Sequence, residues 1–397
     1  MKTNIRHFAF IALILIASNI KAQNSVDNIL SEIAKNNKSI IANKQYWEAK
    51  KLQYKTGLTP YNPSIEYDYL KGTPANAGNQ TEFYILQSFD FPTTYIKKKQ
   101  VAVRQIAQAD FQLAAYRQDI LLKAKQHCIK LIYLNKKQAE LARRLQNAEK
   151  LNNDYQKKLD KGDASRLDVN KAKLQLLNLQ NDLRLNTSQI NQLNQKITGL
   201  NGGTAIRQLA DDTVYSLISA ITDFSTLAST IEANDPVLKS LEQQKEINLK
   251  QVQLCKALAL PKMETGYHSQ AILDQNFQGA FFGITIPLWE NKNTVKFQKA
   301  QVLFSELQVE QHKNEHSYET RQLYENYQNL KITLDEYQQL LSTINNTELL
   351  DKALKLGEIS SIEYFLEISY FYSSYDKYLE LEKEYHQTIA ELYKYQL

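Results

Sequence analysis

The sequence is poor in cysteine, glycine and proline. Only two cysteines, Cys128 and Cys255, occur in 397 residues, which excludes the disulfide framework that stabilises small secreted domains. Each lies in a helix-like segment, and we interpret both as small buried apolar residues rather than as a disulfide pair. The 11 glycines and 7 prolines are clustered. Long segments therefore contain no helix breaker, which favours long helices and coiled coils.

Long apolar runs are also missing after the first residues of the chain. Basic Lys2 and Arg6, the apolar run 8–17 and the small residue Ala22 have the order of a secretory signal peptide. The apolar run is about ten residues long, too short to span a bilayer of roughly 30 Å. We therefore expect export, with a signal peptide over 1–22 that is cleaved near Ala22. Because no later stretch approaches the roughly 18 apolar residues of a transmembrane helix, any contact with a membrane must be made through strands.

The excess of charge is small. The chain has 48 Lys and Arg against 43 Asp and Glu, and the balance is nearly even without the basic signal. This balance gives no reason to expect a nucleic-acid partner.

Breaker positions divide the chain into helix-like runs separated by two stretches rich in Pro and Gly. The runs cover residues 25–57, 94–160, 166–199, 235–259, 290–355 and 361–395. Residues 199–236, in the middle of this series, are less regular and separate two halves. We therefore predict a first repeat over 23–200, an equatorial linker over 201–234 and a second repeat over 235–397.

The two halves resemble each other at a shift of about 195 residues. The segment 159–168 is matched by 354–363, and Pro92 is matched by Pro287, each proline being followed by a very long helix. Pro63 and Pro261 are related by a slightly larger shift. The pattern predicts a duplicated unit of helix, two strands, long helix, tight turn and helix.

Alternating apolar and polar residues predict a β-hairpin over 60–92 and another over 261–287. One face carries apolar residues: Ile65, Tyr67, Phe83, Ile85, Phe89, Phe282 and Ile284. Acids share the other face: Glu66, Asp68, Glu82, Asp90 and Glu264. This period of two is typical of a membrane β-barrel with lipid outside and water inside. Hairpins of a soluble domain are the alternative. Four strands cannot close a barrel alone, so the membrane interpretation requires oligomerisation.

Two helical turns have strong local signals. Gly162 and Gly357 stand where a left-handed residue ends a helix, and Ser165 with Asp168, or Ser360 with Glu363, forms a capping box that starts the next. We expect sharp hairpin tips at 160–168 and 355–363. The helix before the first tip would span about 100 Å. A hairpin of that length has no globular core, so its helices must pair with each other and with neighbouring copies.

The order of these features resembles the TolC-like outer-membrane efflux family over essentially the whole mature chain. The likeness rests on the duplication, the Gly-x-x-Ser-x-x-acid tips and the strand-Pro-long-helix junctions at 87–92 and 283–289. Those junctions look like the corresponding junctions of channels that serve heavy-metal resistance-nodulation-division (RND) pumps, the branch typified by CusC and CzcC. The resemblance implies a mainly α fold with a small transmembrane β part. It also implies a homotrimer in which four strands per protomer build a twelve-stranded barrel and the long hairpins build a periplasmic tunnel.

The same resemblance implies partners and roles for the tips. The expected partners are the chain itself, a periplasmic membrane-fusion adaptor, an inner-membrane RND transporter and outer-membrane lipid. Tip residues would dock the adaptor and line the periplasmic aperture, where Asp168 and Glu363 match the family's tip acids; capping alone is the other interpretation. Arg166 and Lys355 are expected to pair with such acids when the aperture is closed. The acids on the polar face of the two β-hairpins would line the pore, where they keep it hydrated or favour cations.

No arrangement of residues indicates an enzyme, a cofactor or a metal centre. His312 and His316 stand one helical turn apart, and without a third ligand nearby we interpret them as part of a solvated helix face. We therefore expect a passive exit duct for heavy-metal cations or other small toxic compounds. The alternatives are a periplasmic coiled-coil adaptor or scaffold, and an exit channel for type I secretion or for drugs.

Overall fold

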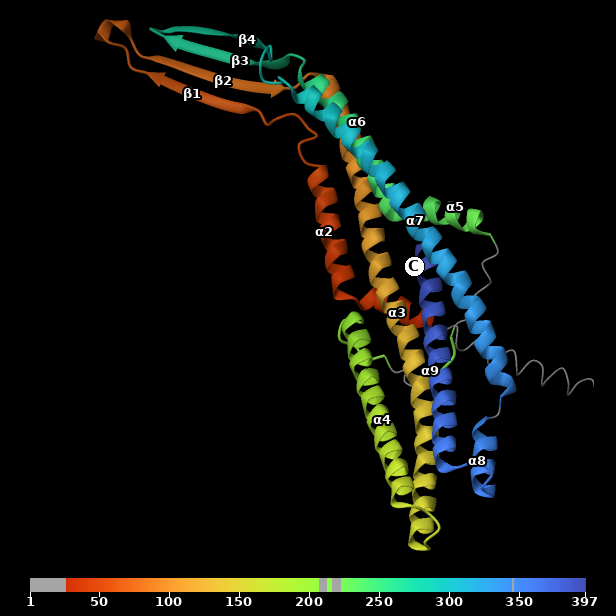
Figure 1. Ribbon diagram of the computed structural model, residues 1–397. Helices are drawn as coiled ribbons and strands as arrows, with labels where there is room; N and C mark the ends of the chain where they lie inside the picture. Colours follow the sequence, from red (N-terminus) through yellow and green to blue (C-terminus); the bar gives the residue numbers. More distant parts are fainter. Residues whose placement is uncertain (1–25, 207–212, 216–222, 345) are drawn as a thin grey trace, which may run out of the picture. The chain divides into compact units, whose positions relative to one another are not determined.

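The computed structural model describes residues 26–206, 213–215, 223–344 and 346–397 (Figure 1). The predicted signal peptide and parts of the predicted linker lie outside the described residues. Among the helices of these ranges, none combines the length and the apolar character needed to cross a membrane.

The described chain is mainly helical with one small sheet, as the sequence predicts. After a helix over 26–36, the first half contains α2 Lys38–Tyr54, β1 Ser64–Leu70, β2 Gln80–Phe89, α3 Pro92–Asp160 and α4 Arg166–Leu200. The rest contains α5 Phe224–Asn234, α6 Pro236–Leu258, β3 Lys262–Ile272, β4 Gln275–Thr285, α7 Thr294–Thr343, α8 Asn346–Leu356 and α9 Ser361–Leu392. Two single 3₁₀ turns, η1 Ala75–Ala77 and η2 Lys394–Gln396, complete the series.

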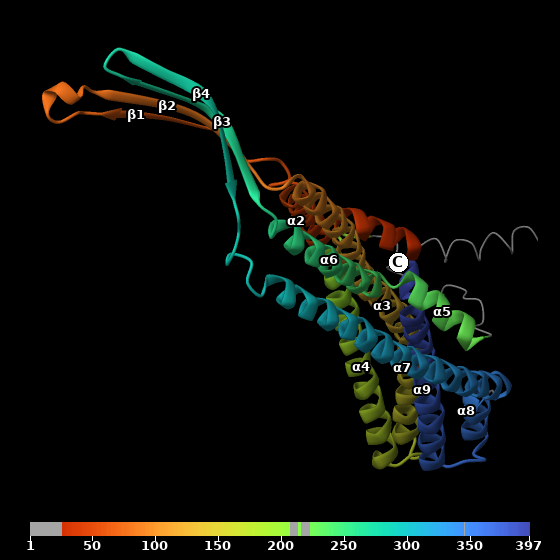
Figure 2. The same cartoon turned by 90° about the horizontal axis from the view of Figure 1, so that it is seen from above.

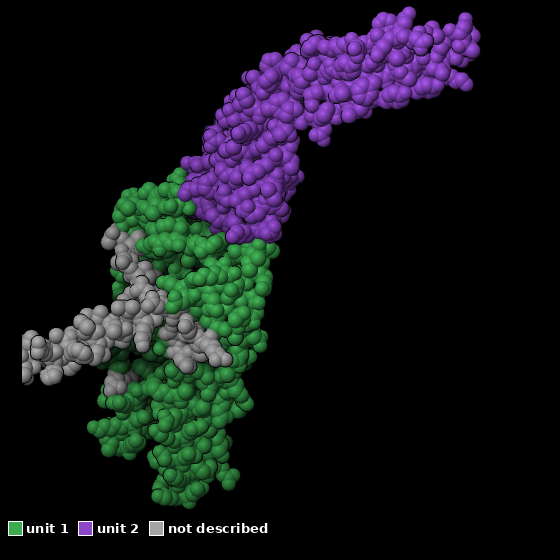
Figure 3. Space-filling model, turned by 180° about the vertical axis from the view of Figure 1, so that it is seen from behind, with its two compact units in different colours: residues 1–42, 116–234, 317–397 green, residues 43–115, 235–316 purple. Residues whose placement is uncertain are grey.

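The chain divides into two compact units, which Figure 3 shows in two colours. Unit 1 is drawn from 1–42, 116–234 and 317–397, and unit 2 from 43–115 and 235–316. Helices α3 and α7 contribute to both units.

In unit 1, α3 lies between α4 and α9 (Figures 1 and 2). Leu141 and Ala148 of α3 are buried against Leu179 of α4. The main core of this unit also includes buried Cys128. In α4 the buried positions Ala172, Leu179, Asn186 and Leu193 recur at seven-residue steps, which is the spacing of a coiled-coil seam. The predicted pairing of the long helices is confirmed, and so is the prediction that Cys128 and Cys255 are buried and free.

Two helix predictions were wrong because local side chains end the helices early. The expected run 25–57 is interrupted at Asn37, whose side-chain oxygen accepts a hydrogen bond from the Ile40 N–H at 2.9 Å and so starts α2. The expected run 290–355 is divided into α7 and α8. There the hydroxyls of Ser342 and Thr343 donate to the carbonyls of Gln339 and Leu340, each at 2.8 Å. Hydroxyl and amide side chains that compete for backbone groups weaken a helix.

The sheet of unit 2 is antiparallel with the order β1-β2-β3-β4 (Figure 2). Strand β2 lies between β1 and β3 because Tyr67 pairs with Phe83 on one side and Phe83 with Ser269 on the other. Leu273 and Asp274, with φ of 47° and 63°, form the two-residue turn between β3 and β4. Strands β1 and β4 are the two edges.

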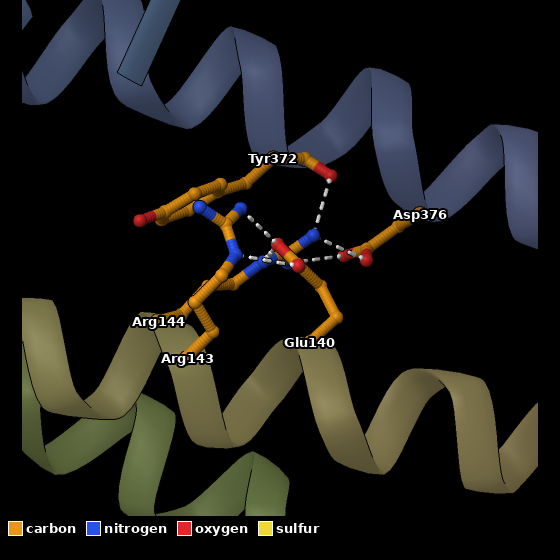
Figure 4. Close-up of polar contacts among 5 residues, drawn as sticks. All are labelled: Glu140, Arg143, Arg144, Tyr372 and Asp376. Atoms are coloured by element: carbon orange, nitrogen blue, oxygen red, sulfur yellow. Dashed lines mark hydrogen bonds and ion pairs between the residues drawn. The ribbon is translucent and has the colours of Figure 1, made fainter. Parts of the chain in front are cut away.

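A buried arginine ties α3 to α9 (Figure 4). Arg144 is 3% exposed, and its Nε donates to Glu140 Oε1 at 2.7 Å. Its two terminal nitrogens donate to Asp376 at 3.0 and 2.9 Å. The guanidinium also lies 4.2 Å from the centre of the Tyr372 ring. We call this set of residues, with Arg143, the Arg144 cluster.

Substitution of Arg144 by Ala should therefore destabilise unit 1 strongly. The change removes one of the two cations that bond buried Glu140 and the cation that bonds Asp376. Removal of one partner of a buried pair costs about 3–5 kcal/mol. Denaturant unfolding followed by circular dichroism measures the loss.

Arg143 provides the matched control. It directly precedes Arg144 in the same helix and also bonds Glu140, at 2.8 Å, but its side chain is 44% exposed. Arg143→Ala should cost about 1 kcal/mol or less, as for exposed pairs. Equal losses in the two variants would contradict a clamping role for Arg144.

Candidate functional site

The first helical tip has the backbone geometry that the sequence predicts. Gly162, with φ of 82°, ends α3 while the Gly162 and Asp163 N–H groups donate to the carbonyls of Leu159 and Lys158 at 3.0 and 2.8 Å. This pair of bonds is a Schellman motif. Ser165 then starts α4 through the confirmed capping box with Asp168. Arg166 is the first residue of α4 and is exposed.

The second tip repeats this geometry. Gly357 has φ of 73°, and the Glu358 N–H donates to the Ala353 carbonyl at 2.9 Å. Ser360 Oγ accepts from the Glu363 N–H at 3.3 Å while the Ser360 N–H donates to Glu363 Oε2 at 2.8 Å. A side chain at either glycine would meet no atom within 4 Å. Backbone conformation, rather than crowding, therefore favours glycine here.

A cleft of about 330 Å³ separates the two tips. Of the predicted tip residues, Asp168, Gly357 and Ser360 line it. Gly162, Ser165, Arg166 and Glu363 are not part of its lining. Near the tips, α3 and α9 touch directly, since the rings of Tyr155 and Phe365 stack with centres 6.3 Å apart.

Hydrogen bonds hold both tip acids in their charged form. Bonds from the Ser165 hydroxyl and backbone lower the pKa of Asp168, with smaller contributions from Ser361 and the charge of Lys171. The backbone and hydroxyl of Ser360 likewise lower the pKa of Glu363. Each tip therefore presents a fixed carboxylate at neutral pH, and Lys171 is a basic neighbour that the sequence analysis did not name.

The strand register places the predicted acids of the sheet on one face. Asp68 pairs directly with Glu82, and Glu66 with Tyr84. Glu264 pairs with Ser88 and accepts a hydrogen bond from its hydroxyl at 2.8 Å. Paired residues of antiparallel strands point to the same side. Glu66, Asp68, Glu82 and Glu264 therefore share a face, which we call the acidic face.

The predicted apolar residues occupy the opposite face. Ile65 pairs with Ile85, and Tyr67 with Phe83. Phe89 pairs with Met263, which pairs in turn with Ile284. Phe282 of the same face is 80% exposed. We call this surface the apolar face; in this single chain it is open to solvent.

Asp90 differs from the other acids. It follows the end of β2, is buried, and forms an ion pair with Lys98 at 2.8 Å. The Tyr95 hydroxyl also accepts a hydrogen bond from the Asp90 N–H at 2.9 Å. The assignment of Asp90 to the acidic face was wrong, because the residue belongs to the junction that starts α3.

The interpretation of His312 and His316 as a solvated face was also wrong. His312 Nε2 lies 2.6 Å and His316 Nε2 3.9 Å from Asp235 Oδ2, at the N-terminus of α6. Burial of Asp235 opposes its charge, but the bonds from His312 and the Val237 N–H outweigh burial and lower its pKa. Across the described ranges, no three His, Cys, Asp or Glu side chains are arranged to hold a metal ion.

Sequence reasoning missed the residues that join the two helical hairpins near their tips. Tyr155 packs with Val169 of α4 and Phe365 of α9. A signal was present, because Leu141, Ala148 and Tyr155 are buried at seven-residue steps along α3. That period marks Tyr155 as a core position but does not reveal its contact with Phe365, 210 positions later.

Comparisons with known proteins were made for sequence and for structure. No family model and no curated protein sequence matches the chain. Its structure is similar to that of CusC, described as forming a transmembrane channel, with a TM-score of 0.74 and 14% identity over 94% of this chain and 92% of that one. The outer-membrane channel OprN gives a TM-score of 0.76 and 13% identity, covering 94% and 89%. The Campylobacter jejuni CmeC outer membrane channel gives 0.71 and 14%, covering 94% and 85%. The chain thus shares the fold of these outer-membrane channels over nearly its whole length.

Proposed function

We propose that this chain is the outer-membrane channel component of a tripartite efflux pump. Three copies close a twelve-stranded barrel, and their long hairpins form a periplasmic tunnel. The chain itself performs no chemistry and acts as a passive exit duct. A periplasmic adaptor docks at the tips and connects the duct to an inner-membrane RND transporter.

The observation that carries this proposal is the sheet with two unlike faces and two open edges. Strands β2, β3 and β4 have 10, 11 and 11 residues, which matches the 9–11 residues or so of a membrane-spanning strand. The apolar face suits lipid, and the acidic face suits a water-filled lumen. Because open edges do not occur in lipid, β4 of one copy must pair with β1 of the next. The similarity of fold to outer-membrane channels supports the same assignment.

Heavy-metal cations are the cargo that we propose, with other small toxic compounds as the broader class. The acids of the lumen face and of the tips would present negative charge along the path of a cation. Rings of acids favour cations in channels. Drugs or a secreted protein would be carried by the same architecture, so transport assays must decide the cargo.

Detergent extraction tests the assembly. The protein should appear in the outer-membrane fraction as a trimer, and variants with one cysteine in β1 and a second in β4 should form intermolecular disulfides. Replacing buried Cys128 and Cys255 by Ala removes the background thiols. A monodisperse monomer recovered from the periplasm would contradict the proposal and favour an adaptor or scaffold.

A charge on the apolar face of β2 should have a different effect from a charge on its acidic face. Ile85→Arg puts a cation against lipid and should impair assembly by about 2–4 kcal/mol per chain near the midplane. Ser88→Arg lies on the acidic face beside Glu264 and should leave trimer yield normal while changing conductance. Trimer yield and single-channel recording measure the two effects. If both variants behave alike, the assignment of the faces is wrong.

Removal of the tip charges should lower cation preference. Asp168→Asn with Glu363→Gln keeps shape and removes two negative charges per chain, while trimer yield should stay normal. Since both pKa values are lowered, the wild-type preference should persist as pH falls until below the ordinary carboxyl range of roughly 4. Single-channel reversal potentials at several pH values measure the change.

Glu367→Gln is the matched control, because Glu367 is exposed on α9 one turn beyond Glu363. It should leave cation preference unchanged. Unchanged selectivity in the double tip variant would restrict Asp168 and Glu363 to helix capping.

A further inference from the structure

A second cavity of unit 1, beside the tip cleft, has a volume of about 380 Å³. Residues of α3 line one side of it, and residues of α8 and α9 line the other. We call it the lysine pocket, since four of its lining residues are Lys150, Lys157, Lys158 and Lys355. Its volume falls within the range of roughly 300–1,000 Å³ typical of small-molecule sites.

The pocket has an apolar floor. Tyr155 and Tyr364 are each 4% exposed, and both residues line the cavity together with Leu151 and Leu354. Such a surface favours the ring or aliphatic body of an organic ligand over a bare inorganic ion.

The rim carries an excess of positive charge. Asp154 and Asp351 are the acids of the lining, so its net charge is +2. Asp351 already accepts a hydrogen bond from the Tyr364 hydroxyl at 2.7 Å. Burial, together with this bond, raises the pKa of Tyr364 and keeps the hydroxyl a donor.

The lysines of the rim keep their ammonium groups available. Within the described part of the chain, none of the four takes part in an ion pair. Lys158 lies 5.8 Å above the Tyr155 ring, a contact that leaves its N–H groups free to bind an anion.

We propose that the lysine pocket binds a small organic anion with an aromatic or aliphatic body and a carboxylate or sulfonate group. The body contacts the tyrosine and leucine floor, and the acid group lies among the lysines. Both parts of the ligand touch α3 and α8, so the ligand bridges the two helical hairpins.

The bridge has a consequence for α8. This helix has 11 residues, a length at which a helix is marginal in water without tertiary support. Leu354 belongs both to the lysine pocket and to the tip cleft. A bound anion therefore stabilises the end of α8 that leads into the second tip; an effect on opening rests on the proposed channel function.

The binding test uses naphthalene-1,5-disulfonate and the purified full-length protein in a non-ionic detergent. Isothermal titration at low salt should show one saturable site per chain, weakened as salt screens the charges. Lys150→Gln with Lys355→Gln should weaken binding by about tenfold, as expected for the loss of two partly exposed charge pairs. Neutral 1,5-dihydroxynaphthalene should bind more weakly than the disulfonate.

Two lysines outside the pocket give the control. Lys352 lies on α8 and Lys173 on α4, both are exposed, and Lys352→Gln with Lys173→Gln should leave the affinity unchanged. Hydrogen exchange of α8 should slow when the disulfonate is added, whereas that of α6 should not.

The proposal is overturned if the disulfonate does not bind, if both lysine pairs weaken it equally, or if the neutral analogue binds as tightly. It is also overturned if binding leaves exchange in α8 unchanged. None of these readouts depends on a channel, so they are independent of the trimer and outer-membrane tests of the proposed function.

Discussion

The pairing of α3 with α4 and α9 is the interaction on which the rest of unit 1 depends. A helix of 69 residues gains little stability in water from its own hydrogen bonds, because most helical stability in proteins comes from burying an apolar face. Here that face is a narrow stripe at seven-residue steps. The amide nitrogen of Asn186, a polar residue of the stripe, donates to the Leu134 carbonyl at 3.0 Å and to Gln138 at 2.7 Å. Arg144 is satisfied by two carboxylates and a ring in the same way.

The defined backbone geometry of the tips depends on this pairing. In each, a Schellman motif and a capping box fix the chain over a few residues, so Asp168 and Glu363 are each held by the N-cap residue of their own helix. A change of the space between the tips would then move whole hairpins rather than single side chains. The contacts that resist such movement lie between hairpins, at Tyr155 with Phe365 and in the Arg144 cluster. They join positions more than 200 residues apart.

That separation explains which features the sequence predicts. Capping boxes, glycine turns and alternating strands are local patterns, and the positions of Ser165, Gly357 and Ile85 follow from a few neighbouring residues. The two hairpins place β1 beside β2 and β3 beside β4, but the pairing of β2 with β3 joins distant residues such as Phe83 and Ser269, and local patterns do not predict it. The contact of His312 with Asp235 likewise joins elements 77 residues apart, and the pattern around each residue shows no sign of the other. Asp90 was misassigned because the alternation of apolar and polar residues in β2 continues past Phe89, the last paired residue. The junction that starts α3 already begins there. The division of α7 from α8 depends on weak helix formers such as Ser342 and Thr343, and the apolar periodicity used to predict the helix does not register them.

The sheet imposes two further requirements that a single chain does not meet. Its edges, β1 and β4, present backbone groups that no other strand of the described ranges pairs with, and its apolar face leaves Ile65 and Phe282 exposed. The closed assembly that we propose would satisfy both, since further copies would pair the edges and every apolar face would turn outward to lipid. The acidic face adds a condition of its own. Asp68 stands directly opposite Glu82, and like charges opposite each other destabilise a sheet unless water separates and screens them. Contact with water therefore favours the acidic face, and the inner surface of the proposed assembly would provide it.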